Sequence, residues 1–174
     1  MKRFEKNLVL IGMPGCGKTT IGKILSSRLN MNFIDLDEYI EKSSSSTIPE
    51  IFKKGEEYFR DLESKAVEEV AKEKSSIIST GGGVIKRKSN MSILKENGII
   101  VFIDRSLEDI INDINTETRP LLKNNEEEIN RLFNERYDIY RKYCDFIVNN
   151  RDIDTVVNDI INLIGGLKIG EKID

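Results

Sequence analysis

Five short apolar runs are spaced along the chain and separated by longer stretches in which apolar residues recur every three or four positions. The runs lie at residues 7–11, 32–34, 76–79, 99–103 and 146–148. Because they are short and apolar throughout, they predict strands buried on both faces of a sheet. The stretches between them predict helices over residues 18–29, 36–74, 107–114, 126–143 and 153–164.

Strands that alternate with helices predict an α/β fold, with a five-stranded parallel sheet between two layers of helices. In such a three-layer α/β/α arrangement the ligand lies at the carboxyl ends of the strands. We therefore expect functional residues directly after strands. One helix is marked by Phe59, Leu62, Ala66 and Val70, whose spacing predicts a single buried stripe.

Two polar segments, residues 43–47 and 115–125, have no helix or strand periodicity and predict mobile surface loops. The second falls in a mobile lid that we expect at about residues 112–124. The length of 174 residues and the 39% hydrophobic content suit one domain spanning residues 1–174. From Gly165 to the end we expect a frayed tail.

Composition excludes several classes of function. A net charge of -3, with acidic and basic residues interspersed, argues against nucleic acid and favours a small-molecule partner. The first apolar run is too short for a signal peptide or a membrane span, so we expect a cytoplasmic protein. Cys16 and Cys144 have no spacing typical of zinc or of a structural disulfide. The absence of histidine excludes a Ser-His-Asp hydrolase.

The sharpest motif is a glycine-rich loop, residues 12–20, which matches G-x-x-x-x-G-K-[ST] between a predicted strand and a predicted helix. Glycines let successive backbone N–H groups face one anion, and Lys18 would reach the β- and γ-phosphates. Thr19 would offer a hydroxyl oxygen to Mg²⁺. The alternative is a glycine turn that matches by chance. The loop residues expected at ATP are Gly12, Pro14, Gly15, Cys16, Gly17, Lys18, Thr19 and Thr20.

Three further features follow predicted strands or lie in the polar segments. Asp35 and Asp37 would either serve magnesium and an attacking hydroxyl or simply favour a helix N-terminus, and the residues alone leave both interpretations open. The glycines 81–83 indicate close approach by a ligand or by another backbone. Arg119 would either close over the nucleotide as a lid residue or stay solvated.

Together these features resemble the shikimate kinase family, from the first strand to about Arg151. The resemblance depends on a set of motifs in a fixed order. They are the glycine loop, Asp35-Leu-Asp37, Ile48-Pro-Glu-Ile-Phe52, Gly55 with Glu56, Phe59-Arg-Asp-Leu-Glu63, Ser79-Thr-Gly-Gly-Gly83, Arg119-Pro-Leu121, and Arg136 four residues before Tyr140.

The resemblance implies a P-loop fold like that of nucleoside monophosphate kinases, a monomer, and phosphorylation of the 3-hydroxyl of shikimate by MgATP. It implies that Asp37 orients the reacting hydroxyl, within a substrate-binding region of about residues 35–63, and that Arg60 and Arg136 grip the carboxylate. Asp35 would hold magnesium through water. The other residues implied at shikimate are Gly81, Gly82 and Gly83, and the catalytic set is Asp37, Lys18 and Arg119.

Two positions depart from the family pattern. Asn112 stands where a lid arginine often packs on adenine, and Arg151 is a candidate for that contact. A serine run at residues 43–46 replaces a common glycine, which would alter loop flexibility. We also expect Cys16, at a helix N-terminus that favours a thiolate, to react with thiol reagents.

Two rival functions share parts of these motifs. Another small-metabolite P-loop kinase, such as a gluconate kinase, would share the loop and the lid. A GTP-dependent switch is less well supported, because no Asn-Lys-x-Asp motif follows any predicted strand. Arg60 and Arg136 favour a small carboxylate as the acceptor.

Overall fold

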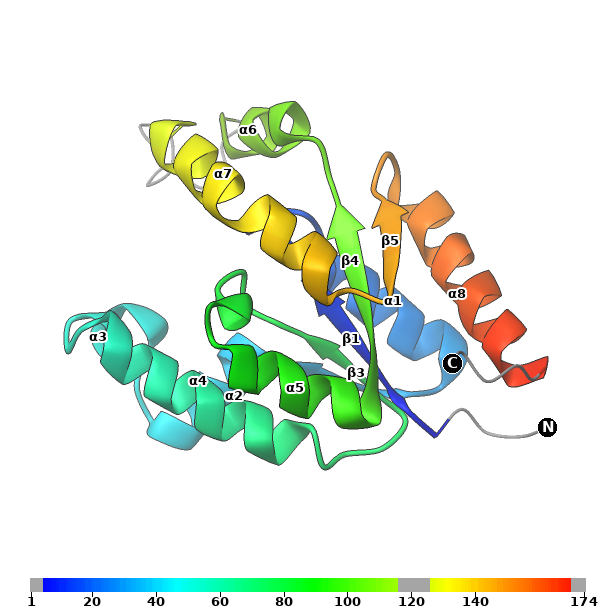
Figure 1. Ribbon diagram of the computed structural model, residues 1–174, viewed down its shortest axis with the longest axis horizontal. Helices are drawn as coiled ribbons and strands as arrows, with labels where there is room; N and C mark the ends of the chain where they lie inside the picture. The colour runs from blue at the N-terminus through cyan, green and yellow to red at the C-terminus, as the bar shows by residue number, and fades with distance from the viewer. Residues whose placement is uncertain (1–4, 116–125, 170–174) are drawn as a thin grey trace.

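The computed structural model describes residues 5–115 and 126–169, and in this part of the chain five parallel strands form one sheet (Figure 1). Their order across the sheet is β2-β3-β1-β4-β5. Each lies within one residue of an apolar run at either end, which confirms the predicted α/β fold. The strands are β1 (Asn7–Ile11), β2 (Asn32–Asp35), β3 (Ser76–Ser79), β4 (Gly98–Asp104) and β5 (Phe146–Asn149).

Strand β1 lies in the centre of the sheet. Leu8 is in register with Ile77 of β3 on one side and with Ile99 of β4 on the other. All five residues of β1 are buried, because helices cover both faces of the sheet. The loop that follows β1 therefore starts from the most constrained position in the sheet.

Helices form the two outer layers (Figure 1). Helix α1 packs against α8 on one face, and α4, α5 and α7 cover the other. Helices α2 and α3 pack on α4, and α6 packs on α7 beyond the end of β4. The bounds are α1 (Lys18–Leu29), α2 (Leu36–Ser44), α3 (Ile48–Phe52), α4 (Glu56–Val70), a 3-10 turn η1 (Val84–Lys86), α5 (Lys88–Asn97), α6 (Leu107–Asn115), α7 (Glu126–Tyr143) and α8 (Ile153–Ile169).

Two expectations about loops are corrected. The segment 43–47 is not a surface loop throughout, because α2 continues through Ser44 and Thr47 starts α3 with a capping box to Glu50. The tail expected from Gly165 is helical as far as Ile169, where α8 ends, and residues 170–174 lie outside the described residues. The buried side chains of α8, which include Ile160 and Ile164, hold the helix against the sheet and offset the low helix propensity of glycine.

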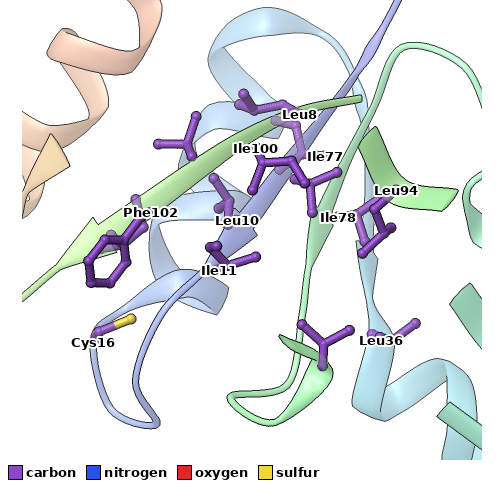
Figure 2. Close-up of a cluster of buried hydrophobic side chains, with 14 of the residues drawn as sticks. Leu8, Leu10, Ile11, Cys16, Leu36, Ile77, Ile78, Leu94, Ile100 and Phe102 are labelled. Carbon is purple, nitrogen blue, oxygen red and sulfur yellow. The ribbon is translucent and has the colours of Figure 1, made fainter. Parts of the chain in front are cut away.

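The core is one connected cluster of aliphatic side chains between the sheet and the helices. Figure 2 shows residues of β1, β3 and β4 meeting Leu36 of α2 and Leu94 of α5. The stripe expected on α4 is present: Phe59, Ala66 and Val70 are buried, and Leu62 is partly buried against the core. Among the helices of residues 5–115 and 126–169, none combines the length and apolar character that a membrane span requires.

Candidate active site

All five strands end at one pocket of about 730 Å³. Its floor is the glycine loop after β1, and its walls come from the segments that follow the other four strands. Convergence of strand ends is the expected consequence of an all-parallel sheet. The lining residues are Pro14, Gly15, Gly17, Lys18, Thr19, Thr20, Asp35, Asp37, Thr80, Gly81, Gly82, Arg105, Ile110, Asp113, Asn150, Arg151, Asp152 and Ile153.

The glycine loop curls tightly around the amino end of α1. Gly12, Gly15 and Gly17 have φ angles of 148°, 82° and 100°, a region that other residues rarely adopt. Lys18 is buried, and its Nζ donates to the carbonyl oxygens of Gly12 at 2.8 Å and Met13 at 3.0 Å. The ammonium group is thus held inside the curve of the loop, where the first N–H groups of α1 also point.

Cys16 faces the core rather than the pocket. Its side chain has no exposed surface, and Figure 2 shows it close to Phe102 and Ile11. The sulfur also fills space beside Gly12, where an added Cβ would lie 2.8 Å from Sγ. The expectation that thiol reagents reach Cys16 is therefore wrong for this conformation, because the loop folds the thiol under its own backbone.

Thr19 and Asp35 place oxygen atoms at the junction of α1 and β2. The Thr19 hydroxyl donates to Asp35 Oδ2 at 2.8 Å, and the Ser79 hydroxyl lies 3.4 Å from Thr19 Oγ1. The other Asp35 oxygen, Oδ1, accepts from the N–H groups of Asp37 and Glu38 and so caps α2. The two interpretations of Asp35 are therefore compatible, since one oxygen caps the helix and the other faces the loop.

Asp37 lies in the first turn of α2 with its carboxylate toward Gly81. A Cβ on Gly81 would lie 3.0 Å from Asp37 Oδ1. Burial, and then the neighbouring Asp35 carboxylate, raise the pKa of Asp37, although Lys18 and Arg60 act in the opposite direction. The Asp37 carboxylate thus lies at the pocket, and the positive charges of Lys18 and Arg60 offset part of the increase in its pKa.

Arg60 is buried on α4 and held by two carboxylates of the same helix. Its Nη1 lies 2.7 Å from Glu63 Oε2 and its Nη2 lies 3.2 Å from Glu56 Oε1. Burial raises the pKa of Glu63, and the ion pair with Arg60 opposes that effect. A side chain at Gly83 would overlap the guanidinium group, so glycine leaves room for Arg60 at the end of the glycine segment.

Arg136 is buried on α7, one turn before Tyr140. Its Nε has no hydrogen-bond partner among the described residues, and its charge is met there by Glu135 Oε1 at 3.9 Å. The Tyr140 hydroxyl donates to the Gly82 carbonyl at 2.5 Å, and its ring stacks on Phe102. Helix α7 therefore contacts the glycine segment through Tyr140, one turn after Arg136, and α4 contacts it through Arg60.

Residues of other segments of the protein lie close to the backbone of residues 81–83, as the three glycines led us to expect. A Cβ on Gly82 would lie 2.7 Å from the Pro14 ring, so this glycine lets the glycine loop and the β3 end touch. Gly81 and Gly83 face Asp37 and Arg60 in the same way. Glycine leaves room at these positions for the glycine loop and for two charged side chains, which meet there.

Most of the residues chosen from the sequence converge at or beside the pocket. Among the chosen residues, those that line it are Pro14, Gly15, Gly17, Lys18, Thr19, Thr20, Asp35, Asp37, Gly81, Gly82 and Arg151. Gly12 and Cys16 support the loop from behind, Arg60 lies against Gly83 beside the lining glycines, and Arg136 lies one turn before Tyr140, which contacts Gly82. Asn112 is exposed on α6. Arg119 and most of the expected lid lie outside the described residues.

Sequence reasoning missed three polar residues at strand ends. Thr80 donates its hydroxyl to the Leu10 carbonyl at 2.8 Å, Arg105 donates to the Gly15 carbonyl at 3.1 Å, and Asn150 donates to the Cys16 carbonyl at 2.8 Å. Each directly follows the last residue of a strand. The rule that functional residues follow strands would have found them if it had been applied to every strand.

Comparisons with known proteins point to one family. A family model described as "Shikimate kinase" matches residues 14–165. A shikimate kinase of Clostridium beijerinckii is 53% identical over 162 residues, which covers 92% of this chain and 96% of the relative. The solved shikimate kinase of Acinetobacter baumannii, in complex with shikimate, superposes with a TM-score of 0.88 at 31% identity, over 97% of each chain.

A more distant structure shares the fold alone. A gluconokinase from Sinorhizobium meliloti 1021 superposes with a TM-score of 0.61, but at 15% identity, over 97% of this chain and 98% of its own. The family model and the 53% identical relative together cover almost the whole of this chain, including the glycine loop and the glycine segment after β3. The chain therefore belongs to the shikimate kinase family, whose members are ATP-dependent kinases.

Proposed function

We propose that this protein transfers the γ-phosphoryl group of ATP to the 3-hydroxyl of shikimate and that Asp37 orients that hydroxyl. One observation carries the assignment of roles. The Asp37 carboxylate lies within the fields of Lys18, on the phosphate side, and of Arg60, on the far side of the glycine segment. A hydroxyl held by Asp37 would then lie between a phosphate-binding group and a carboxylate-binding group.

The reaction needs in-line positioning more than strong base catalysis. The hydroxyl oxygen forms a bond to the γ-phosphorus while the bond from that phosphorus to the β,γ-bridging oxygen breaks, and ADP leaves. The hydroxyl proton passes to Asp37 Oδ1 or Oδ2 or to the transferred phosphoryl group. The raised pKa of Asp37 makes the carboxylate a better acceptor than an exposed aspartate.

Two guanidinium groups support recognition of a carboxylate. Arg60 on α4 lies against Gly83, and Arg136 on α7 lies one turn before Tyr140, whose hydroxyl donates to the Gly82 carbonyl. Arg136 Nε has no hydrogen-bond partner among the described residues and lies 3.9 Å from Glu135 Oε1. A planar guanidinium binds a carboxylate through two parallel hydrogen bonds. We propose that the pair binds the carboxylate of shikimate, while the glycine N–H groups face the ring.

The donor set of the pocket fits Mg²⁺. The lining holds three cationic side chains, Lys18, Arg105 and Arg151, and four carboxylates, Asp35, Asp37, Asp113 and Asp152. The triphosphate would therefore enter a site without an excess of positive charge. Thr19 and Asp35 would hold the ion, with Asp35 acting through water, and the ion would neutralise the β- and γ-phosphate oxygens.

Acceptor specificity tests the proposal. MgATP consumption by the purified protein should be measured with shikimate, gluconate, AMP and no acceptor. We expect rapid ADP release with shikimate alone, and the product should carry the phosphate on the 3-hydroxyl by ³¹P NMR. Turnover with gluconate and not with shikimate would keep the P-loop kinase fold and reject the acceptor.

The remaining expectations concern the number of domains, the oligomeric state and the cellular location. We propose that the chain acts as a single-domain monomer in the cytoplasm, where ATP is available. The described lining of the pocket comes from the five strand ends of one sheet, which supports catalysis by a single copy. Sedimentation at the concentration used for the assay measures the mass of the active species.

A further inference from the structure

Asn150, directly after β5, is a buried amide that the catalytic roles above leave unused. Its side chain lines the pocket and its surface is 8% exposed. Its Nδ2 donates to the carbonyl oxygen of Cys16 at 2.8 Å. Its backbone N–H donates to the Asp104 carbonyl at 2.7 Å, so the end of β4 fixes the point from which the side chain projects.

The bond to Cys16 sets the direction of the next N–H group. A trans peptide is planar, and its C=O and N–H point to opposite sides. When Asn150 holds the Cys16 carbonyl on one side of the loop, the N–H of Gly17 must point to the other. Gly17 is the N-cap of α1 and lines the pocket, so its N–H joins the unpaired donors at the helix start.

The contact between Asn150 and the loop also favours glycine at position 17. Its φ of 100° lies in the region that favours glycine, and a Cβ there would lie 3.0 Å from Asn150 Nδ2. The glycine of the motif thus permits both the loop curvature and the close approach of the amide. Arg105 holds the preceding carbonyl, that of Gly15, but it also pairs with Asp113 at 2.6 Å and is more exposed.

We propose that Asn150 is a positioning residue for phosphate binding. By fixing the Cys16–Gly17 peptide it aims the Gly17 N–H at the phosphates of the nucleotide before the nucleotide arrives. The proposal rests on the proposed function only in taking a nucleoside triphosphate as the ligand. Without the amide the peptide is free to rotate, and the phosphate site loses an oriented donor.

The test removes the Asn150 amide and measures binding of the phosphate part and of the nucleoside part of the nucleotide separately. The variants are Asn150→Ala and Asn150→Asp, and the controls are Asn149→Ala and Asn149→Asp at the exposed neighbouring residue. Dissociation constants are measured by calorimetry for ADP, for inorganic tripolyphosphate and for adenosine, and KM is measured for ATP and for shikimate. Tripolyphosphate lacks the base and adenosine lacks the phosphates.

We expect Asn150→Ala to weaken ADP and tripolyphosphate binding about three- to tenfold, the usual effect of one lost hydrogen bond. Asn150→Asp should weaken both by more than about tenfold, because its carboxylate repels the Cys16 carbonyl and the phosphates. KM for ATP should rise with both variants. Adenosine binding, KM for shikimate and both Asn149 variants should stay within about twofold of the wild type.

Three results would overturn the proposal. The first is ADP binding by Asn150→Ala that matches Asn149→Ala. The second is an equal loss of adenosine and ADP affinity, which would mean that Asn150 only shapes the wall of the pocket. The third is a low melting temperature for both Asn150→Ala and the polar variant Asn150→Ser, which would make the residue structural. Because no acceptor is present in the binding assays, they stand even if the acceptor is not shikimate.

Discussion

Asp37 is a partly buried carboxylate of the candidate site, and its negative charge lowers the stability of the folded protein. Its pKa is raised chiefly by burial and then by Asp35, so the protein holds a carboxylate in a place that disfavours its charge. A raised folded-state pKa stabilises the fold fully below the unfolded-state pKa, about 3.9, and this stability is lost as the pH rises through the folded-state pKa. At neutral pH, Asp37 therefore destabilises the folded state.

The variant Asp37→Asn separates stability from catalysis. We expect kcat to fall by at least about 100-fold, because the acceptor hydroxyl loses its orienting carboxylate, while ADP affinity changes less than about twofold. At pH 8 the variant should melt at a higher temperature than the wild type, and the gap should close as the pH falls toward about 4.

Calorimetric melts from pH 4 to pH 8 and steady-state kinetics measure both effects. A near-normal kcat would leave Asp37 as a residue of the α2 N-terminus with no role in orienting the acceptor. A melting temperature that is lower than the wild type by the same amount at every pH would show that burial of the charge is not its main energetic effect.

At the scale of elements, α7 is anchored to the sheet by two tyrosine hydroxyl groups. Tyr140 donates to the Gly82 carbonyl, and Tyr137 donates to Asp104 Oδ2 at 2.9 Å. Arg136 lies on the same helix next to both tyrosines. Because the Tyr140 anchor ends at the glycine segment, it fixes the distance between Arg136 and the backbone that we propose to face the acceptor.

The variant Tyr140→Phe keeps the ring on Phe102 and removes only the hydroxyl. We expect a loss of about 1–2 kcal/mol of stability, because the part-buried Gly82 carbonyl loses its donor. We also expect KM for shikimate to rise several-fold while KM for ATP changes less than about twofold. The control is Tyr137→Phe, which removes a hydroxyl from the same helix but not from the glycine segment.

Equilibrium unfolding and steady-state kinetics on both variants supply the comparison. Tyr137→Phe should lower the stability without moving KM for shikimate. An equal rise in that KM for the two variants would mean that α7 responds to any loss of anchoring, and the specific link through Gly82 would be rejected.

At the scale of the whole molecule, a ligand that binds at the carboxyl ends of the strands is expected to stabilise the fold. The strands reach the pocket from both halves of the sheet, so a nucleotide bound there contacts segments that are far apart in the sequence. A ligand that binds only the folded state raises the free energy of unfolding, by about 2.7 kcal/mol at 100 times its Kd.

For a chain of this length the melting temperature rises by roughly 2–4 °C per kcal/mol. We therefore expect MgADP at 100 times its Kd to raise the melting temperature by about 5–11 °C. In Lys18→Met the shift at the same concentration should largely disappear, since the phosphates lose their cation. Scanning calorimetry with and without MgADP measures both, and an undiminished shift in Lys18→Met would contradict the placement of phosphates at the glycine loop.

The strands, the glycine loop and the family were predictable because each depends on neighbours in the sequence. An apolar run predicts a buried strand, and the spaced glycines 12, 15 and 17 before Lys18 predict a phosphate loop from local geometry alone. The boundaries that were wrong, at Ser44 and Gly165, depend on contacts from other elements. The prediction that thiol reagents react with Cys16 was wrong for the same reason. The thiol is buried in the core that β1 and β4 help to form.

By itself, the sequence determined which residue types stand after which strands, and hence a P-loop kinase of the shikimate kinase family. Only the tertiary structure decided that Asn150 holds the Cys16 carbonyl, that Glu63 holds Arg60 deep in the protein, and that Tyr140 reaches Gly82. Two of these three contacts join residues more than fifty positions apart, and all three depend on side-chain burial. Local propensity carries no information about the two long-range pairs, and it does not tell that the Arg60–Glu63 pair of α4 is buried, since burial exists only once the sheet and its helices have packed.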